Sequence, residues 1–425
     1  MSCSEIDEGK IYTGFGKALA IVGTGCKPVG TEKLPIDLCN NRILAENLHS
    51  QLDNPSCDVS LKDGFAVKFE DIATASAKKP VCLNIIGSAF AGNAFNGEVF
   101  AKDAVNICSG APIPQGADTV IAGEFCEITP ECVRIIKGAK KGQNILTTGK
   151  DIKKGEELAP HGRILLPGDL GLIASAGISA VNVYRKPRVT VIAIGDEVVA
   201  PGGHLHPGQL YASNLVTIAA WLDSFAFPCQ TAVVKDDKEE IRKKLEEVFA
   251  TADVILTSGG AWGSERDLII GIMDELGWQK KFGNVRMGPG KGVSFGLWQN
   301  KPVFCLPGGP ASNEMAFLQL ALPGILKMEG QKRHPLPTVF AKLTKNVISR
   351  HRDWAEFKSA VLVYNGEYMV TPYHNRSRLQ SIANATCFIC IPEGVEKIPA
   401  GETIEVQILT PALGGLSIVR RRYAK

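Results

Sequence analysis

Several acidic residues of this sequence stand directly after apolar runs, where they could hold a metal ion. Asp196, Glu197 and Asp236 follow such runs and offer carboxylate oxygens, which hard divalent cations prefer. Asp267 follows a further run, together with the Ser-Gly-Gly segment at residues 258–260, whose exposed backbone amides suit a phosphate. A cation beside a phosphate would favour cleavage of a phosphate bond, because negative charge concentrates there.

A lysine and a proline-framed glycine pair could complete such a site. Lys291 lies in a Pro-Gly bend and provides a positive point charge for an oxyanion. The run VFCL ends in Pro307-Gly308-Gly309-Pro310, where proline fixes φ and glycine lets another group approach the backbone. We predict that this segment forms a rigid wall of the pocket, and that Ser312 caps the next helix and donates a hydrogen bond. A purely structural turn is the alternative interpretation.

The elements that would position these residues are expected between residues 188 and 329. Apolar, β-branched runs alternate there with amphipathic segments of helical length, such as residues 236–252. This alternation is typical of a parallel sheet with helices on both faces. Ligands bind at the carboxyl ends of the strands in such sheets, so the residues above are expected along one edge.

The rest of the chain divides into further domains, and the fold class that we expect is multidomain, α/β plus β. Residues 56–141 consist of short β-like runs broken by Gly and Pro and predict a β-rich inserted domain. Residues 1–55 and 142–187 are expected to form one discontinuous module of mixed α and β structure. Residues 188–329 are expected to form the α/β domain described above, and residues 330–425 a small C-terminal β domain.

Composition and charge exclude several classes of function. The 425 residues carry a net charge of +3, which gives no reason to expect binding to nucleic acid or to an anionic membrane. No apolar segment approaches the ~20 residues of a membrane span, and the acidic N-terminal segment lacks the features of a signal peptide, so we expect a cytoplasmic location. The cysteines lie mostly in apolar runs, and we expect Cys387 and Cys390 to be reduced core thiols rather than zinc ligands.

Seven motifs in register give the sequence a family resemblance. In chain order they are DVSLKDGFA at 58–66, SGAPIPQGAD at 109–118, GKDI at 149–152, IGDEV at 194–198, SGG at 258–260 with Asp267 downstream, PGKG at 289–292 and LPGGPAS at 306–312. They are similar to D-N-S-A-M-D-G-Y-A, T-G-A-P-x-P-x-G-A-D, G-x-D-I, T-G-D-E-L, S-G-G, P-G-K-P and L-P-G-N-P-x-S of the MoeA-type molybdopterin molybdenumtransferases, which include the gephyrin E domain. The resemblance covers nearly the whole chain.

The resemblance implies an architecture and a reaction. It implies four domains in an elongated homodimer, with the active site where the parallel-sheet domain of one subunit meets the β-rich domain of the other. It also implies that adenylylated molybdopterin is hydrolysed at its phosphoanhydride, that AMP leaves and that molybdate enters between the dithiolene sulfurs, with Mg²⁺ as cofactor. A molybdopterin adenylyltransferase or a client molybdoenzyme is a further partner that this function allows.

The matching positions and the residue chemistry together give the site that we expect. The catalytic residues are Asp63, Asp151, Asp267 and Lys291, and the metal ligands are Asp196, Glu197 and Asp236. The residues expected to bind the substrate are Ser60, Ser109, Gly195, Ser258, Gly259, Gly260, Pro307, Pro310, Ser312, Arg378 and Ser381. The chain departs from the family pattern at Val59, Lys62, Ile194, Trp262, Gly288, Trp354 and Ser359, so the carboxylates are kept while some oxyanion contacts are not.

Three alternative functions stay open at this point. A non-catalytic molybdopterin carrier or scaffold would need the same pocket, although loss of several carboxylates would have favoured it and they are present. An adenylyltransferase or a nucleotide pyrophosphatase could use the same type of sheet domain, but stand-alone adenylyltransferases of this type are much shorter. A homologue that inserts tungstate is indistinguishable by sequence, because both oxyanions are tetrahedral dianions of nearly equal size.

Overall fold

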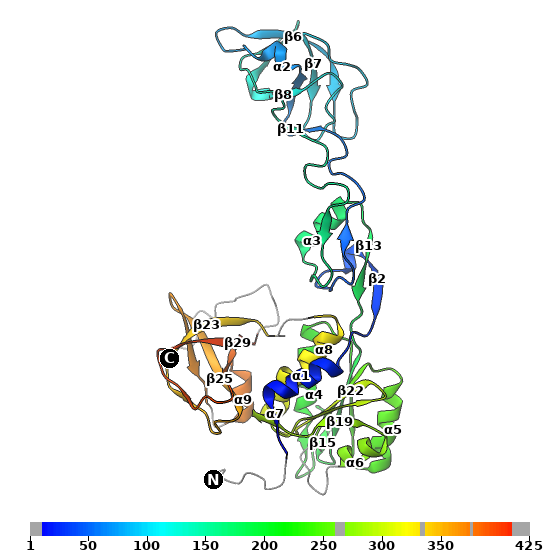
Figure 1. Cartoon of the computed structure of the whole chain (residues 1–425), viewed down its shortest axis with the longest axis vertical. Coiled ribbons are helices and arrows are strands. Elements are labelled where there is room, and N and C mark those ends of the chain that lie inside the picture. Colours follow the sequence, from blue (N-terminus) through cyan, green and yellow to red (C-terminus); the bar gives the residue numbers. More distant parts are fainter. Residues whose placement is uncertain (1–10, 260–267, 332–335, 375–376, 410–425) are drawn as a thin grey trace. The chain divides into compact units, whose positions relative to one another are not determined.

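The structure, a computed structural model, describes residues 11–259, 268–331, 336–374 and 377–409 (Figure 1). The chain separates into two compact units, one of residues Glu32–Val183 and the other of the residues on either side of them. The first unit contains the β-rich segment, and the second contains the α/β and C-terminal domains. No helix among the described residues is long and apolar enough to cross a membrane.

The α/β domain is built on one six-stranded sheet. In order across the sheet, the strands are β17 (Cys229–Val234), β14 (Val189–Ile194), β18 (Val254–Ser258), β22 (Lys301–Leu306), β21 (Ser294–Trp298) and β19 (Gln279–Phe282). The first four run parallel, as predicted, whereas β21 and β19 are antiparallel at one edge. Every residue of β14 and β18 is buried, which explains why these strands are continuous apolar runs in the sequence.

Helices cover both faces of this sheet (Figure 1). One face packs against α1 (Phe15–Gly25), α4 (Ser213–Ser224), α7 (Pro310–Ala316) and α8 (Leu322–Met328), and the other against α5 (Lys238–Phe249) and α6 (Leu268–Glu275). Strand residues alternate between the two cores that result, with Leu256 and Phe304 in one and Ile255 and Cys305 in the other. This alternation is the two-residue period of a strand that is buried on both faces.

Helix α5 shows how local sequence fixes one of these helices. The Asp237 carboxylate accepts hydrogen bonds from the backbone N–H groups of Glu239 (3.0 Å) and Glu240 (2.8 Å) and so caps the helix. The apolar residues of this segment lie against the sheet, and the buried ones are Ile241, Leu245 and Val248. The predicted amphipathic helix is confirmed.

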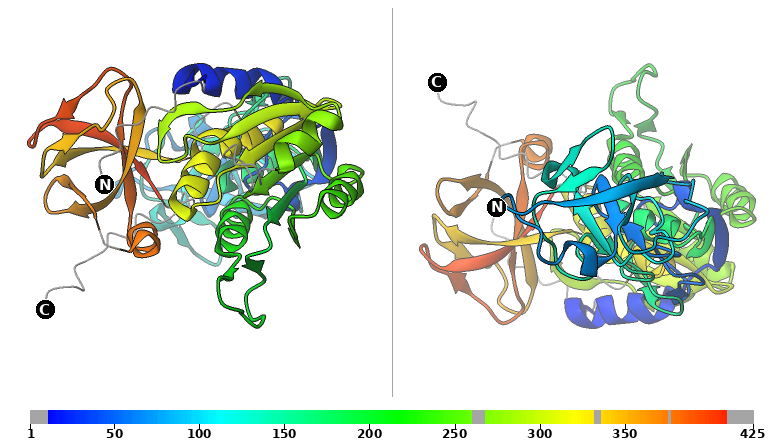
Figure 2. Two further views of the ribbon diagram at one scale, coloured as in Figure 1. Left: turned by 90° about the horizontal axis from the view of Figure 1, so that it is seen from below. Right: turned by 90° about the horizontal axis from the view of Figure 1, so that it is seen from above.

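Helix α1 belongs with the α/β domain, whereas we expected residues 1–55 to lie together in the discontinuous module. Ala18 and Val22 of this helix are buried in the same core as Phe304 and Ile325, and α1 lies alongside the α/β domain in Figure 2. The boundary between the two units falls after Thr31. An amphipathic helix follows whichever apolar surface can bury its stripe, and sequence spacing does not reveal that surface.

The Glu32–Val183 unit contains a small mixed part and a six-stranded sheet. In the mixed part, β2 (Thr31–Pro35) pairs with β13 (Ala180–Tyr184), and β3 (Leu48–His49) pairs with β12 (Glu157–Ala159), beside helix α3 (Pro167–Ser175). The larger sheet runs in the order β8 (Thr119–Ala122), β5 (Gly64–Val67), β7 (Asp103–Ile107), β6 (Val81–Ala89), β10 (Val133–Ile135) and β9 (Cys126–Ile128). The strand pairs of the mixed part therefore join residues that precede and follow the β-rich segment.

The C-terminal domain is a small closed β structure. Strand β25 (Ala355–Tyr364) pairs on one side with β26 (Tyr368–Pro372) and on the other with β27 (Cys387–Ile391). Strands β23 (Thr338–Leu343) and β29 (Thr403–Ile408) complete the ring between them. Cys387 is buried and Cys390 half-buried within β27, and both are free thiols, as predicted.

A charged cluster joins the amino ends of two central strands. Asp253, just before β18, accepts hydrogen bonds from both terminal nitrogens of Arg185 at 2.9 and 3.1 Å and from the backbone N–H of Arg188 at 2.8 Å. Burial opposes ionisation of Asp253, but these hydrogen bonds outweigh it and hold the pKa of the carboxyl well below its usual range. A depressed pKa means that this carboxylate stabilises the fold above the unfolded pKa of about 4 and stops doing so as the pH falls through the folded pKa.

We therefore expect Asp253→Asn to lower the free energy of unfolding by roughly 1.5–3 kcal/mol between pH 5 and 8, with a deficit that shrinks below about pH 4. All five tryptophans lie within residues 221–354, so urea unfolding followed by tryptophan fluorescence reports on this unit. Asp223→Asn, at an exposed position, is the matched control and should change the free energy little. A deficit that stays constant down to pH 3 would contradict this account of Asp253.

Candidate functional site

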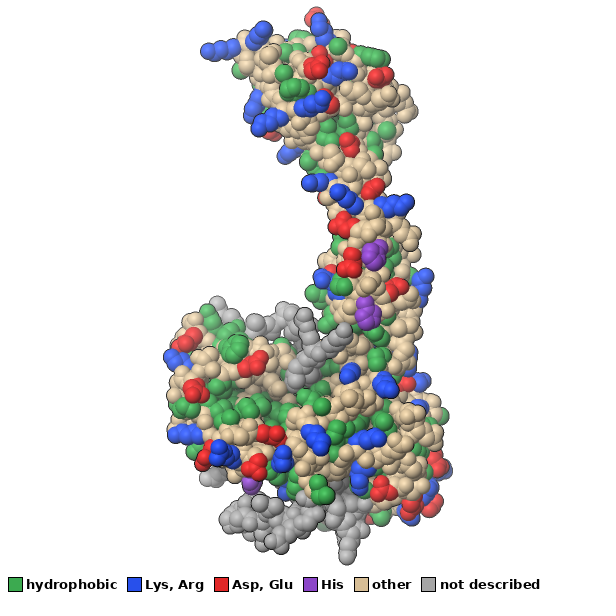
Figure 3. Space-filling view, viewed as in Figure 1, with side chains coloured by type: hydrophobic (Ala, Val, Ile, Leu, Met, Phe, Trp, Pro, Cys, Tyr) green, Lys and Arg blue, Asp and Glu red, His purple; other side chains and the backbone are tan. Residues whose placement is uncertain are grey.

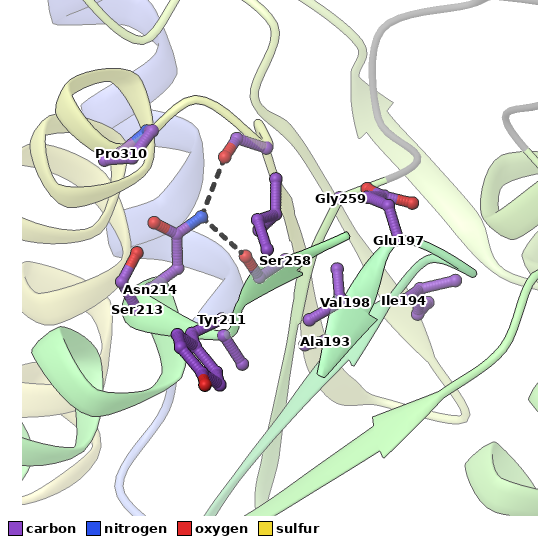
Figure 4. A pocket seen from close by; sticks show the side chains of 13 residues that line it. Ala193, Ile194, Glu197, Val198, Tyr211, Ser213, Asn214, Ser258, Gly259 and Pro310 are labelled. Carbon is purple, nitrogen blue, oxygen red and sulfur yellow. Dashed lines mark hydrogen bonds between the residues drawn. The ribbon is translucent and has the colours of Figure 1, made fainter. Parts of the chain in front are cut away.

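The carboxyl ends of three parallel strands meet at one pocket (Figure 4). Glu197 follows β14, Ser258 and Gly259 end β18, and Gly308 and Pro310 follow β22. The cavity has a volume of about 170 Å³, and its lining is completed by Ala193, Ile194, Val198, Leu210, Tyr211, Ala212, Ser213 and Asn214. A volume this small, below the ~300 Å³ of typical ligand pockets, suits one group of a ligand, such as a phosphate, rather than a whole cofactor.

Backbone contact between these strand ends depends on Gly259. Its φ is +100°, and a Cβ on this residue would lie 2.5 Å from the carbonyl oxygen of Ile194. A Cβ built on Gly308 would in turn lie 3.7 Å from the Cα of Gly259. The loop after β18 can therefore lie against the loops after β14 and β22 only because Gly259 has no side chain.

Ser258 is the centre of a side-chain network that ties these loops together. Its Oγ accepts a hydrogen bond from Asn214 Nδ2 at 3.1 Å and another from Asn313 Nδ2 at 3.0 Å. Asn214 Nδ2 also donates to the carbonyl oxygen of Gly308 (2.8 Å), and Asn313 Nδ2 to that of Pro307 (2.9 Å). Figure 4 shows the two bonds of Asn214 as dashed lines. The start of α4, the end of β18 and the PGGP segment are thus held as one assembly.

The predicted metal ligands lie at the adjoining strand ends. The backbone N–H of Asp236, after β17, donates to Asp196 Oδ1 at 3.2 Å, which brings these two residues together. Glu197 is exposed, lines the pocket, and its backbone carbonyl accepts from Leu210 N–H at 2.8 Å. Among the residues that the structure describes, no group of three or more His, Cys, Asp or Glu side chains is placed to hold a metal ion. The assignment of Asp196, Glu197 and Asp236 stays a prediction.

The loop with Lys291 packs on helix α7. A Cβ on Gly290, whose φ is +115°, would lie 3.3 Å from the Ser312 carbonyl oxygen and 3.4 Å from the Ala316 nitrogen. Lys291 therefore follows a residue that contacts the first turns of the helix, although it is not part of the pocket lining. Ser312 lies inside α7, whose N-cap is Gly309, so the predicted capping role of Ser312 is wrong. The N-cap lies three residues earlier than expected, because Pro310 suits the first helical position.

The two prolines of the PGGP segment have different surroundings. Pro310 is the first residue of α7 and lines the pocket, as expected for a wall. Pro307 is buried and does not line the pocket, and its carbonyl oxygen is the acceptor for Asn313. The segment thus contributes two backbone carbonyls to the network and one ring to the pocket.

Further predicted site residues lie in the Glu32–Val183 unit. Asp63 and Ser109 lie together, since Asp63 Oδ1 accepts the backbone N–H of Ser109 at 2.7 Å. Ser60 is buried, donates to the Lys62 carbonyl oxygen (2.6 Å) and accepts from its N–H (3.2 Å), so this hydroxyl shapes the turn before Asp63. Asp151 is exposed in the same unit.

The remaining predictions concern α9 (Arg378–Ala383) and the segment after Gly259. Helix α9 lies against α7, and Ser381 Oγ within it donates to the Ser377 carbonyl oxygen at 3.0 Å. The side chain of Arg378 is outside the described part of the structure, and so are Gly260 and Asp267. Gly195, at the end of β14, is buried beside Glu197.

Sequence reasoning missed Asn214 and Asn313. Both stand in an Ala-Ser-Asn tripeptide, at residues 212–214 and 311–313, and both tripeptides fall at the start of a helix on the same face of the sheet. That repetition was the available signal. It was easy to overlook, because serine and asparagine are common at helix starts for reasons of capping alone.

Comparison with known proteins places this arrangement in a family. The chain matches family models described as the MoeA N-terminal region (domains I and II) at residues 14–177, a probable molybdopterin binding domain at 190–327 and the MoeA C-terminal region (domain IV) at 341–409. Molybdopterin molybdenumtransferase of Haemophilus influenzae is 31% identical over 395 residues, which cover 91% of this chain and 96% of that protein. The chain belongs to the MoeA family.

Other members of the MoeA family match over similar lengths. Molybdopterin molybdenumtransferase 2 of Mycobacterium tuberculosis is 30% identical over 401 residues, which cover 93% of this chain and 98% of that protein. The crystal structure of the molybdopterin biosynthesis MoeA protein of Pyrococcus horikoshii has a TM-score of 0.82 at 33% identity, covering 94% of this chain and 99% of that one. The multidomain MoeA architecture expected from the sequence is confirmed at this level.

The role of Gly259 in this member of the MoeA family can be tested by one methyl group. Gly259→Ala should lower the free energy of unfolding by roughly 1–3 kcal/mol, because alanine is strained at positive φ and its Cβ would collide with Ile194. Gly309→Ala is the matched control: its φ is −69° and its Cβ would meet nothing within 4 Å. That control should change the free energy of unfolding by less than about 1 kcal/mol in the same urea titration, because the loss of a favourable N-cap residue opposes the gain from a less flexible unfolded chain. Equal effects of the two substitutions would show that the strand ends do not depend on Gly259.

Proposed function

We propose that this protein is a molybdopterin molybdenumtransferase, which inserts molybdate into adenylylated molybdopterin and releases AMP to form the molybdenum cofactor. The relatives of similar length are named for this activity. The observation that carries the proposal is the convergence of a carboxylate, a buried hydroxyl and a glycine loop at one pocket on the carboxyl edge of the sheet. Phosphoanhydride hydrolysis needs groups of these kinds around the charge that develops.

The described residues are compatible with Mg²⁺ as the cofactor of this reaction. Mg²⁺ is commonly bound by one or two carboxylates, several waters and the phosphates of the substrate rather than by a complete protein cage. Asp196 and Asp236 lie together at adjoining strand ends, and Glu197 borders the pocket beside them. In our proposal these three side chains hold the ion, which would neutralise charge on the phosphoanhydride. Lys291 and Ser258 would hold oxyanion oxygens.

A homodimer is the second part of the proposal. Asp63 and Ser109 form a hydrogen-bonded pair in the Glu32–Val183 unit, whereas the pocket belongs to the other unit. We propose that Asp63, Ser109 and Asp151 of one subunit complete the site of its partner, as the family resemblance implies. Cytoplasmic location is proposed on the same basis.

A non-catalytic molybdopterin carrier is the second candidate function. One observation favours it: the described carboxylates do not form a three-ligand metal cluster. Incubation with adenylylated molybdopterin, Mg²⁺ and molybdate distinguishes the two functions when AMP and the molybdenum content of the product are measured together. The transferase should release AMP in step with molybdenum incorporation, whereas a carrier would bind the substrate and release no AMP. Replacing molybdate by tungstate in the same assay tests the choice of oxyanion.

The metal assignment predicts a specific loss in Glu197→Gln. This substitution keeps the size of the side chain but removes its charge, so AMP release should fall by about 10²-fold or more at low Mg²⁺ concentration. Thermal melting should be unchanged, because Glu197 is exposed. The exposed Glu246→Gln on α5 is the matched control and should release AMP at the wild-type rate. Wild-type AMP release by Glu197→Gln would remove Glu197 from the metal site.

The shared site predicts complementation between two inactive chains. Asp63→Ala and Glu197→Gln homodimers should each be inactive, while hybrid dimers would contain one intact site and one doubly altered site. Free exchange in an equal mixture should therefore restore about a quarter of the wild-type AMP release. Subunit exchange is verified with differently tagged chains. A mixture that exchanges subunits but stays inactive would place both residues in a site within one chain.

A further inference from the structure

The hydrogen bonds around Ser258 determine which way its hydroxyl points. Ser258 is 4% exposed and Asn313 is 1% exposed, so the hydrogen bond between them is shielded from bulk water. The Ser258 Oγ lies 3.1 Å from Asn214 Nδ2 and 3.0 Å from Asn313 Nδ2. What each atom donates or accepts can be derived from the chemistry of its partners.

The orientation of both amides is set by backbone carbonyls. Asn313 Nδ2 is 2.9 Å from the Pro307 oxygen, and Asn214 Nδ2 is 2.8 Å from the Gly308 oxygen. A carbonyl oxygen only accepts, so the amide atom facing it has to be the nitrogen, which removes the usual ambiguity of amide orientation. Each NH₂ group therefore uses one hydrogen on a carbonyl and the other on Ser258.

Ser258 is left with one hydrogen to donate. A hydroxyl has two acceptor positions and one donor hydrogen, and the two amides occupy both acceptor positions. Within the part of the chain that the structure describes, this hydrogen has no hydrogen-bond acceptor, while the residue itself lines the pocket. A buried donor without an acceptor costs about 1–3 kcal/mol, so an acceptor inside the pocket would be bound favourably.

We infer that Asn214 and Asn313 are positioning residues, which fix the Ser258 hydroxyl as a hydrogen-bond donor to an anionic oxygen in the pocket. The inference rests on the proposed function and adds the residues that give its oxyanion site a defined polarity. Both hydrogens of each NH₂ group are used on protein acceptors, so these groups act through Ser258 and have no hydrogen left to donate to the ligand. The site favours groups with acceptor oxygens, such as phosphate or molybdate, over protonated amines, which can only donate.

The same network connects this hydroxyl to the starts of two helices and to the PGGP segment. Asn214 lies in the first turn of α4 and Asn313 in α7, and each clamps one carbonyl of the PGGP segment. Removing Asn313 would free the Pro307 carbonyl and one acceptor position of Ser258 at once. The hydroxyl could then turn towards that carbonyl and away from the pocket. Asn313→Ala should therefore reproduce the binding defect of Ser258→Ala, although Asn313 itself never reaches the ligand.

The test compares AMP, adenosine and molybdate as probes of the intact protein by isothermal titration calorimetry. Adenosine lacks only the phosphate of AMP, and molybdate is the alternative source of an oxyanion. Asn313→Ala and Ser258→Ala should each weaken the binding of the same oxyanion probe, either AMP or molybdate, about 10-fold or more. The affinity for adenosine should be unchanged. Loss for AMP alone identifies a phosphate position, and loss for molybdate alone identifies a molybdate position. The double variant should be no weaker than either single variant, because both changes remove the same donated hydrogen bond.

Two further variants separate positioning from general stability. Gln319→Ala removes a different buried amide, which lies on the π-helical segment after α7 (Phe317–Ala321) and pairs with Gln407 of β29. This variant should have a lower melting temperature and unchanged oxyanion binding. Asn214→Ala, at a half-buried position, should weaken the same oxyanion as Asn313→Ala and serves if Asn313→Ala does not fold.

Suppose that the wild-type protein binds an oxyanion probe and releases AMP from its substrate. If Asn313→Ala or Asn214→Ala then binds that probe with unchanged affinity, the proposed function stands and the inference is overturned. Additive losses in the double variant, or equal losses for adenosine and AMP, overturn it as well, because they indicate a disturbed fold. A wild-type protein that binds neither oxyanion and releases no AMP overturns both the inference and the proposed function.

Discussion

The hydrogen bonds that meet at Ser258 hold the candidate site together. They join the end of β18 to α4 and to the PGGP segment, and two of the residues involved, Ser258 and Asn313, are almost fully buried. In a low-dielectric interior each of these bonds is stronger than in water, and each polar group left unpaired is correspondingly costly. The network therefore acts as a single unit, in which one missing amide would release both a backbone carbonyl and a hydroxyl.

Backbone geometry allows this network to form. Gly259 lets the loop after β18 contact Ile194, and Gly290 lets the loop before Lys291 contact α7. The parallel strands bring four loops to one edge of the sheet, and their buried apolar residues fix the register from both faces. The site thus combines a rigid core, which positions the strand ends, with small residues that permit the loops to approach one another.

The sequence predicted the parts of this fold that follow from local patterns. The alternation of apolar runs and amphipathic segments was sufficient for the four parallel strands and for the buried face of α5. Helix α1 was misplaced, because its apolar stripe matches a surface formed by residues some three hundred positions later, where Lys327 contacts the carbonyl of Gly23. The antiparallel edge strands were not anticipated.

The site was predicted through its motifs but not through its hydrogen bonds. Gly259, Glu197 and Pro310 stand at the pocket as expected, whereas Ser312 was given the capping position that Gly309 occupies. Asn214 and Asn313 were missed because their bonds to Ser258 cross 44 and 55 residues of chain, a pairing that no local pattern encodes. Capping preferences offered a simpler explanation for both asparagines.

The measurement that tests this account most directly is a high-resolution crystal structure of the protein with AMP and molybdate bound. The account predicts an oxyanion oxygen within about 2.5–3.0 Å of Ser258 Oγ, with Asn214 and Asn313 still donating to that hydroxyl. An oxyanion bound out of reach of Ser258, or either asparagine turned from Ser258 to the ligand, would contradict it.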